Sequence, residues 1–177
     1  MEKTYIISVF CENRIGLINR ISIIFTRRRL NIENFTASET EIKDVYRFAI
    51  VVTSTREKLE KVCQQIEKQI EVLRALVHEE EEVIYQEVAL YKINAKSLHN
   101  GSAEKLAKEN HAKILTSTPD YVVFEKTGLF EETQDLLKKL EKYGVMEFAR
   151  SGRVVILKWS KRFHQHLKDF EQLEVNN

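Results

Sequence analysis

The sequence has few cysteines, almost no net charge and no long apolar run. Cys11 and Cys63 are its only two cysteines, too few for a disulfide framework, and this predicts a reducing cytoplasm. Lys plus Arg number 28 and Asp plus Glu 27, so no excess of one charge favours nucleic acid or an anionic membrane. No run approaches the ~18 apolar residues of a membrane span. The first residues also lack the long apolar region and cleavage site of a signal peptide.

Recognised catalytic and metal-binding motifs are absent as well. There is no Gly-Lys-Ser/Thr phosphate loop, no Gly-x-Ser-x-Gly elbow and no His-Glu-x-x-His helix. His164 and His166 are two residues apart, which on a helix points them to different sides, so a solvated tail is favoured over a metal site. The remaining histidines lack neighbouring ligand residues and are predicted to be surface or capping groups: His78, His99 and His111. The sequence therefore predicts no catalytic residue and no metal.

The composition is that of a folded protein. Hydrophobic residues make up 43% and charged residues 31% of the 177 residues, a balance typical of globular domains. The length suits two domains of about eighty residues each.

The first half predicts the order strand, helix, strand, strand, helix, strand. The predicted strands are residues 4–11, 31–40, 45–53 and 72–78, and the first helix begins in the loop 12–16. Ser54 and Glu57 are predicted to form a capping box at the second helix. Its buried stripe is predicted to consist of Leu59, Val62, Cys63, Ile66 and Ile70. This βαββαβ order is that of the ferredoxin-like split unit.

The second half repeats that order after a block of four glutamates. The predicted organisation is a first domain at 4–78, an acidic linker at 79–86, a second domain at 87–159 and a tail at 160–177 whose apolar spacing suits a helix. The second half is expected to carry one added strand, and Gly144 to end its last helix. The fold class is therefore α+β, with two tandem ferredoxin-like domains.

The loop between the first strand and the first helix, Glu12 to Leu17, is the segment most suited to binding. Free amides at a helix start favour a carboxylate, Gly16 allows close approach, and the Asn13 amide both donates and accepts. A free amino acid has the charged groups that fit, and Leu17 and Ile32 are candidate walls for an apolar side chain. The structural alternative is that Asn13 is an N-cap and Gly16 a helix-packing residue.

Several motifs in one register carry a family resemblance. They are Glu12-Asn13 to Gly16, Arg20, Leu30-Asn31-Ile32-Glu33, Val72-Leu73-Arg74 and Ala149-Arg150-Ser151-Gly152. The loop resembles that of ACT domains, which sense amino acids. The whole set resembles the small regulatory subunits of acetolactate synthase, also called acetohydroxyacid synthase, over about residues 4–158.

That resemblance implies a regulator of branched-chain amino acid biosynthesis, not an enzyme by itself. Such a chain binds and activates the large catalytic subunit, which holds thiamine diphosphate, magnesium and FAD, and makes it sensitive to valine. No cofactor is implied in this chain. An ACT homodimer is implied, with the effector-binding residues divided between two chains: Asn13, Gly16 and Leu17 from one, Asn31 and Ile32 from the other, and Ser38 as a further position.

Two departures from the family and two alternatives accompany this prediction. Arg29-Leu30 stands where relatives commonly have Gly, so the turn after the first helix is made without glycine. Leu17 stands where a smaller residue is frequent, which narrows the pocket or shifts effector preference. The alternatives are a free-standing tandem ACT sensor and an RNA-binding ferredoxin-like protein, although the aromatic pattern of RNA-recognition strands is missing.

Overall fold

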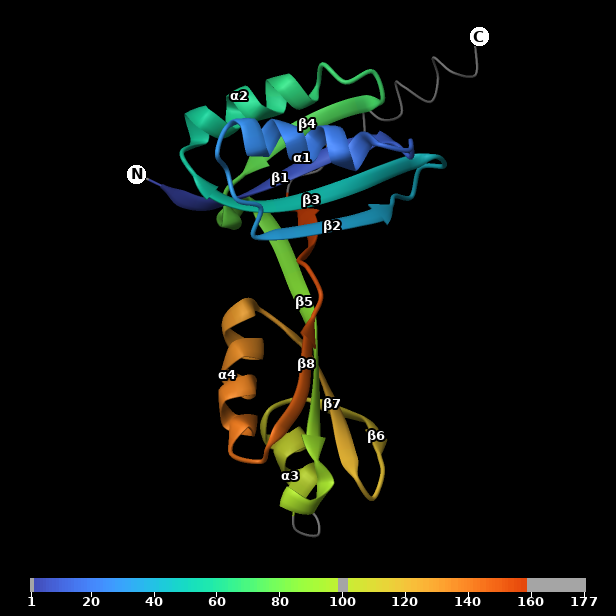
Figure 1. Ribbon diagram of the computed structural model, residues 1–177, viewed down its shortest axis with the longest axis vertical. Coiled ribbons are helices and arrows are strands. Elements are labelled where there is room, and N and C mark those ends of the chain that lie inside the picture. The colour runs from blue at the N-terminus through green and yellow to red at the C-terminus, as the bar shows by residue number, and fades with distance from the viewer. Residues whose placement is uncertain (1, 99–101, 159–177) are drawn as a thin grey trace. The chain divides into compact units, whose positions relative to one another are not determined.

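A computed structural model describes residues 2–98 and 102–158 of the chain. The backbone divides into two compact units, the first built mainly on residues up to Ile84 and the second on Tyr85–Val154, with residues 34–37 grouped in the second and residues 155–158 in the first. The predicted α+β class with two ferredoxin-like units is confirmed (Figure 1). The predicted domain bounds, 4–78 and 87–159, stay a prediction.

The first half has the predicted order of elements. They are β1 (Lys3–Glu12), α1 (Leu17–Arg27), β2 (Asn34–Glu39), β3 (Val45–Ser54), α2 (Arg56–Ile66) and β4 (Val72–His78). The strands form a sheet in the order β2-β3-β1-β4. Two long antiparallel ladders align β1 with β3 and β4, pairing Ile7 with both Ile50 and Val77.

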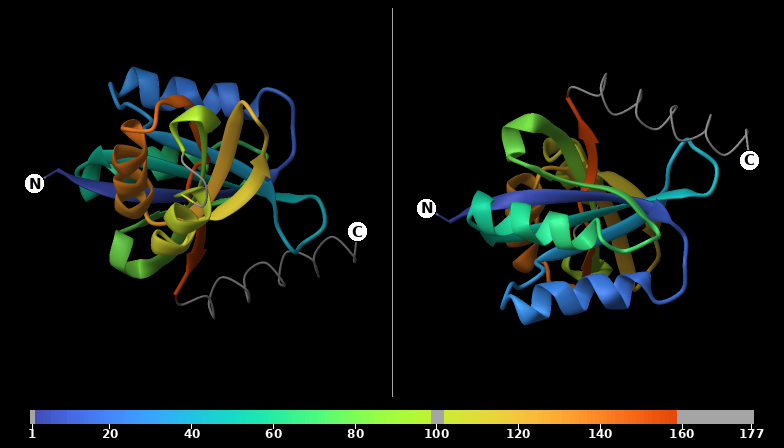
Figure 2. Two further views of the ribbon diagram at one scale, coloured as in Figure 1. Left: turned by 90° about the horizontal axis from the view of Figure 1, so that it is seen from below. Right: turned by 90° about the horizontal axis from the view of Figure 1, so that it is seen from above.

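Helices α1 and α2 lie on one face of this sheet (Figures 1 and 2). The helical period of apolar residues explains this placement, because it gives α1 one buried stripe: Leu17, Ile21, Ile24 and Phe25. The corresponding stripe of α2 is Leu59, Val62, Cys63 and Ile66. Cys63 is a core residue as predicted, and burial raises the pKa of its thiol to about 12.

Two details of α2 differ from the sequence prediction. Thr55, not Ser54, is the N-cap, and no side chain caps the helix. Ser54 is 1% exposed at the end of β3, where the strand's alternation turns its side chain inward, while Glu57 pairs with Lys61 at 2.6 Å. Ile70 is 98% exposed, because the helix ends at Ile66 and the helical period no longer applies there.

The glutamate block is more structured than a solvated linker. Glu80–Glu82 form a short 3-10 helix, and its Glu82 carboxylate accepts from the Glu79 amide at 2.8 Å. Strand β5 (Val83–Asn94) starts immediately afterwards, with Val83 buried. The strand therefore starts inside the segment 79–86 that the sequence predicts as a linker, because Val83, Tyr85 and Glu87 continue its inward-facing alternation.

The second half repeats the order and adds one strand, as predicted. After β5 come a 3-10 turn, η2 (Ala95–Ser97), then α3 (Ser102–Glu109), β6 (Lys113–Ser117), β7 (Tyr121–Gly128), α4 (Phe130–Glu141), β8 (Val145–Arg150) and β9 (Val154–Leu157). The sheet order is β6-β7-β5-β8, and β9 also pairs with β5. The predicted tail, 160–177, with His164 and His166, lies outside the described residues, as does His99.

The core of this second half lies between its sheet and its helices. Tyr91 is fully buried at its centre, and its hydroxyl donates to the carbonyl oxygen of Thr133 at 2.7 Å. Leu136 and Leu140 pack there from α4. Gly144, at φ +74, provides the left-handed residue after α4 that its sequence position predicts.

The turn after α1 is made by an arginine in a conformation that glycine prefers. Arg29 has φ +53, and its amide donates to the carbonyl oxygen of Thr26 at 3.0 Å. The left-handed region costs an L-residue roughly 1 to 2 kcal/mol. The structure therefore shows how the turn forms without glycine, and where it stores strain.

We expect Arg29→Gly to raise the free energy of unfolding by up to about 1 kcal/mol, because glycine adopts φ +53 without a Cβ clash. The matched control is Arg27→Gly, inside α1, which should lower it by about 1 kcal/mol. Urea unfolding followed by circular dichroism measures both. Equal destabilisation by the two substitutions would contradict strain at Arg29.

His78 is buried at the end of β4, contrary to its predicted surface role. It is 9% exposed and pairs with Ile6 across the ladder to β1. Burial, with smaller effects of Arg47 and Arg56, lowers the pKa of His78 from 6.5 to about 4. The sequence suggests that a strand end is exposed to solvent, but His78 is buried here, opposite Ile6 in the ladder.

This burial predicts a loss of stability in mild acid. Since the folded-state pKa lies below the unfolded one, the unfolded chain takes up the proton first, and stability falls as pH drops from 6.5 towards 4. Between pH 7 and pH 5 we expect His78 to contribute a loss of about 1 to 2 kcal/mol. His78→Gln should remove that part of the pH dependence in chemical denaturation. An unchanged difference between the two pH values would disprove it.

Candidate functional site

The loop between β1 and α1 contains an uncapped helix start. Gly16 is the N-cap of α1 at φ +84, and no side chain hydrogen-bonds to the cap. The first turn of α1 also has no acidic residue. The positive end of the helix dipole is thus left without a negative side chain, which favours an anion from outside.

The geometry of this loop decides against the structural alternative for Asn13 and Gly16. Asn13 is exposed and lies three residues before the N-cap, so it is not the cap. A Cβ added to Gly16 would meet nothing within 4 Å, so Gly16 is not a packing residue. Gly16 is instead needed for its left-handed backbone, which turns the chain sharply from strand to helix.

The side chain of Leu17 lies in the core. Leu17 is 1% exposed, whereas Ile15 is fully exposed and Ile18 is 50% exposed. The loop therefore presents Ile15 and Ile18 to solvent, and Leu17 contributes to the loop only through its backbone. Its amide contacts the carbonyl oxygen of Arg14 at 3.3 Å.

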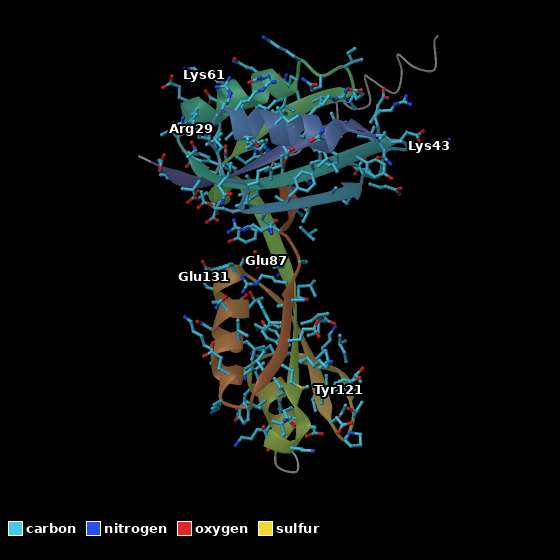
Figure 3. All side chains as sticks on the ribbon, in the orientation of Figure 1. Arg29, Lys43, Lys61, Glu87, Tyr121 and Glu131 are labelled. Carbon is cyan, nitrogen blue, oxygen red and sulfur yellow. The ribbon has the colours of Figure 1, made fainter. Side chains whose placement is uncertain are left out.

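One chain does not bring all the predicted site residues together. Asn31 and Ile32 follow the far end of α1, an 11-residue helix about 16 Å long. Figure 3 labels Arg29, just before them, at the end of the sheet opposite Lys43 in the β2–β3 turn. Ser38 is exposed on β2, an edge strand of the sheet. Asn13 and Gly16 form one group, and Asn31 and Ile32 another.

Glu71, in the loop between α2 and β4, makes two contacts with the residues around the β1–α1 loop. Arg20 pairs with Glu71 at 2.6 Å, and this contact holds the pKa of Glu71 below its usual range. The amide of Glu12 donates to the carbonyl oxygen of Glu71 at 2.9 Å. The Glu12 carboxylate pairs with Arg14 at 2.9 Å. The charged side chains around the loop are thus paired with one another.

Sequence reasoning missed two residues beside this loop, Tyr46 and Glu39. Tyr46 stands opposite Cys11 in the β1–β3 ladder, and its hydroxyl donates to the Glu39 carboxylate at 2.6 Å. The β1–α1 loop and the β2–β3 turn lie at the same end of the sheet (Figures 1 and 2). Knowledge of how β1 pairs with β3 would have pointed to Tyr46, because this pairing places it next to the end of β1.

The second-half motif Ala149-Arg150-Ser151-Gly152 surrounds a buried carboxylate. Glu87 is 3% exposed and lies 3.5 Å from Arg150 and 3.7 Å from Arg153, and burial raises its pKa. The Arg150 guanidinium also lies over the Phe130 ring at 4.4 Å. In Figure 3, Glu87 and Glu131 are labelled in this half. The motif acts here as a packed ionic cluster.

The part of the chain that the structure describes has no group of three or more His, Cys, Asp or Glu side chains placed to hold a metal ion. No helix in the same ranges is long and apolar enough to span a membrane.

Fold and loop together define the class of protein. The first half is an ACT domain, since residues 7–74 match the model of the AHAS small subunit-like ACT domain. Residues 86–159 match the family model described as the small subunit of acetolactate synthase. A solved structure of the acetolactate synthase small subunit of Thermotoga maritima has the same fold, with a TM-score of 0.80 and 24% identity, covering 89% of this chain and 98% of that one.

Curated relatives extend the match along most of the chain. The acetolactate synthase small subunit of Mycolicibacterium smegmatis is 33% identical over 86% of this chain and 90% of its own length. A probable acetolactate synthase small subunit of Methanothermobacter thermautotrophicus is 30% identical, over 89% and 95% respectively. This chain belongs to the family of acetolactate synthase small subunits.

The burial of Leu17 predicts a large effect on stability. Leu17→Ala should lower the free energy of unfolding by about 2 to 5 kcal/mol, because it opens a cavity in the core. Ile18→Ala, one residue along and half exposed, should lower it by less than about 1 kcal/mol. Thermal and urea unfolding report both values. Similar, small effects of the two substitutions would mean that Leu17 does not belong to the core.

Proposed function

We propose that this chain is the regulatory subunit of an acetolactate synthase, that it binds and activates the catalytic large subunit, and that it confers feedback inhibition by valine. The observation that carries the effector site is the uncapped start of α1 at Gly16, beside the exposed Asn13. Backbone amides and the helix dipole suit the α-carboxylate of an amino acid. Leu17 takes part through its backbone, and Ile15 and Ile18 supply apolar surface.

The complete effector site takes residues from two chains. Asn31 and Ile32 lie about one helix length from Gly16 in the same chain, so a partner subunit is needed to bring such a pair beside the loop. We propose an ACT homodimer in which they face Asn13, Gly16 and Leu17 across the interface, with Ser38 on the exposed edge strand β2. A site divided in this way responds to any shift between the chains.

In this proposal, valine regulates the enzyme because it binds two arrangements of the complex with different affinities. Valine inhibits only if it binds the less activating arrangement of the complex more tightly, and a typical coupling free energy is ~1 to 3 kcal/mol. Catalysis and its cofactors, thiamine diphosphate, magnesium and FAD, belong to the large subunit in this proposal. The cytoplasm is the proposed location.

The primary test measures acetolactate formation by the cognate catalytic subunit, alone and with this chain, each with and without millimolar valine. Activation that valine reverses is the expected result. Activation untouched by valine would retain the subunit role and reject the effector site. No activation at all would favour a free-standing amino-acid sensor.

Gly16→Asp is the sharpest substitution at the site. It places a carboxylate where that of the effector would bind, so we expect loss of the valine response with activation retained. Gly16→Ala is the matched control: it brings the same backbone strain at φ +84, about 1 kcal/mol, but no charge and no contact within 4 Å. The control should still respond to valine. Equal loss in both variants would assign the effect to strain.

A further inference from the structure

The loop between β8 and β9 is held by two side chains of β2. Asn34 and Thr36 are two residues apart on that strand, so their side chains point to the same side of it. The Arg153 amide donates to the side-chain oxygen of Asn34 at 3.1 Å, and the Thr36 hydroxyl donates to the Arg153 carbonyl oxygen at 3.1 Å. Both main-chain polar groups of one residue are therefore bound by β2. We call this pair of hydrogen bonds the clasp.

Gly152 lets the loop come close enough for the clasp to form. A Cβ built on Gly152 would lie within 3.0 Å of Thr36 Cγ2 and of Asn34 Oδ1, closer than non-bonded atoms approach. A side chain at this position would therefore push the loop away from β2. The glycine of the Ala149-Arg150-Ser151-Gly152 motif thus serves the contact with β2, whereas the arginine serves the ionic cluster around Glu87.

The same loop is bound to β5. The Ser151 amide donates to the Val88 carbonyl oxygen at 2.8 Å, and the Val88 amide donates to the Ser151 hydroxyl oxygen at 2.9 Å. The Arg153 guanidinium lies 3.7 Å from the Glu87 carboxylate and 4.2 Å from the centre of the Tyr85 ring. A shift of Arg153 is therefore passed to β5, an inner strand of the second sheet.

The clasp lies where the chain passes from one compact unit to the other. Residues up to Glu33 belong to the first unit, whereas residues 34–37 belong to the second, together with Tyr85–Val154. Asn31 and Ile32, which the proposed effector site takes from one chain, come just before this boundary. A ligand that shifts these two residues acts on the clasp through the chain itself, because only Glu33 lies between them and β2.

We propose that Asn34 and Thr36 are positioning residues that couple effector binding to the second half of the chain, by holding or releasing the main chain of Arg153. This inference rests on the proposed effector site and adds the route by which its occupancy changes the subunit. The clasp is an element with two states, formed and released, that a ligand can bias. In this role neither side chain contacts the effector, so loss of the clasp weakens inhibition while valine still binds.

The test makes two measurements on each variant: valine binding to the full chain by calorimetry, and acetolactate formation by the complex with the catalytic subunit. The second gives the ratio of activity without valine to activity at saturating valine. Thr36→Val keeps the shape but removes the hydroxyl, and should lower this ratio about two- to tenfold, the range of one hydrogen bond. Asn34→Ala should act likewise. Thr36→Ser and Asn34→Asp, which keep the donor and the acceptor, should restore the wild-type ratio.

Gly152→Ala disrupts the clasp from the side of the loop. It should lower the same ratio, with no further effect once Asn34→Ala is present, because the two substitutions break one contact. The control is Asn110→Ala, which removes an asparagine whose side-chain hydrogen bonds lie elsewhere in the second half, and should change nothing. An unchanged ratio in Asn34→Ala and Thr36→Val, or loss of valine binding by either, would overturn the proposal. A wild-type complex that valine does not inhibit would instead reject the effector site on which the inference rests.

Discussion

The sharp turn at Gly16 is the constraint on which the first domain depends. A left-handed residue at this point lets a ten-residue strand change directly into a helix whose apolar stripe faces the sheet. The same turn leaves the helix without a side-chain cap and with no acidic residue in its first turn. One backbone feature therefore both buries Leu17 and leaves the start of the helix without a side-chain cap.

The chain also turns through a left-handed residue after the far end of α1, and that residue is an arginine. Arg29 takes the left-handed conformation at φ +53, although a glycine would do so without strain. The segment that follows carries Asn31 and Ile32, which the proposed effector site takes from a second chain. The helix α1 thus separates these two loops within one chain, and its length sets the distance between them.

The two halves share an order of elements but differ in what is buried. The first half buries uncharged polar side chains, Ser54 and His78, and its Tyr46 and Glu39 meet at the end of the sheet beside the loop. The second half buries a carboxylate, Glu87, beside Arg150 and Arg153. A buried ion pair of this kind contributes little net stability but fixes how its neighbours pack.

The sequence by itself determined the order of elements, both ferredoxin-like units and the loop at Asn13 and Gly16, because periodicity and glycine placement are local properties of the chain. Only the tertiary structure decided that Leu17 points inward, that His78 is buried, and that Ser54 does not cap α2. It also brought Tyr46 to Glu39 and beside Cys11, since strand pairing joins residues that are apart in the chain. Burial and hydrogen bonding across strands depend on neighbours in space, and those neighbours exist only once the sheet has formed.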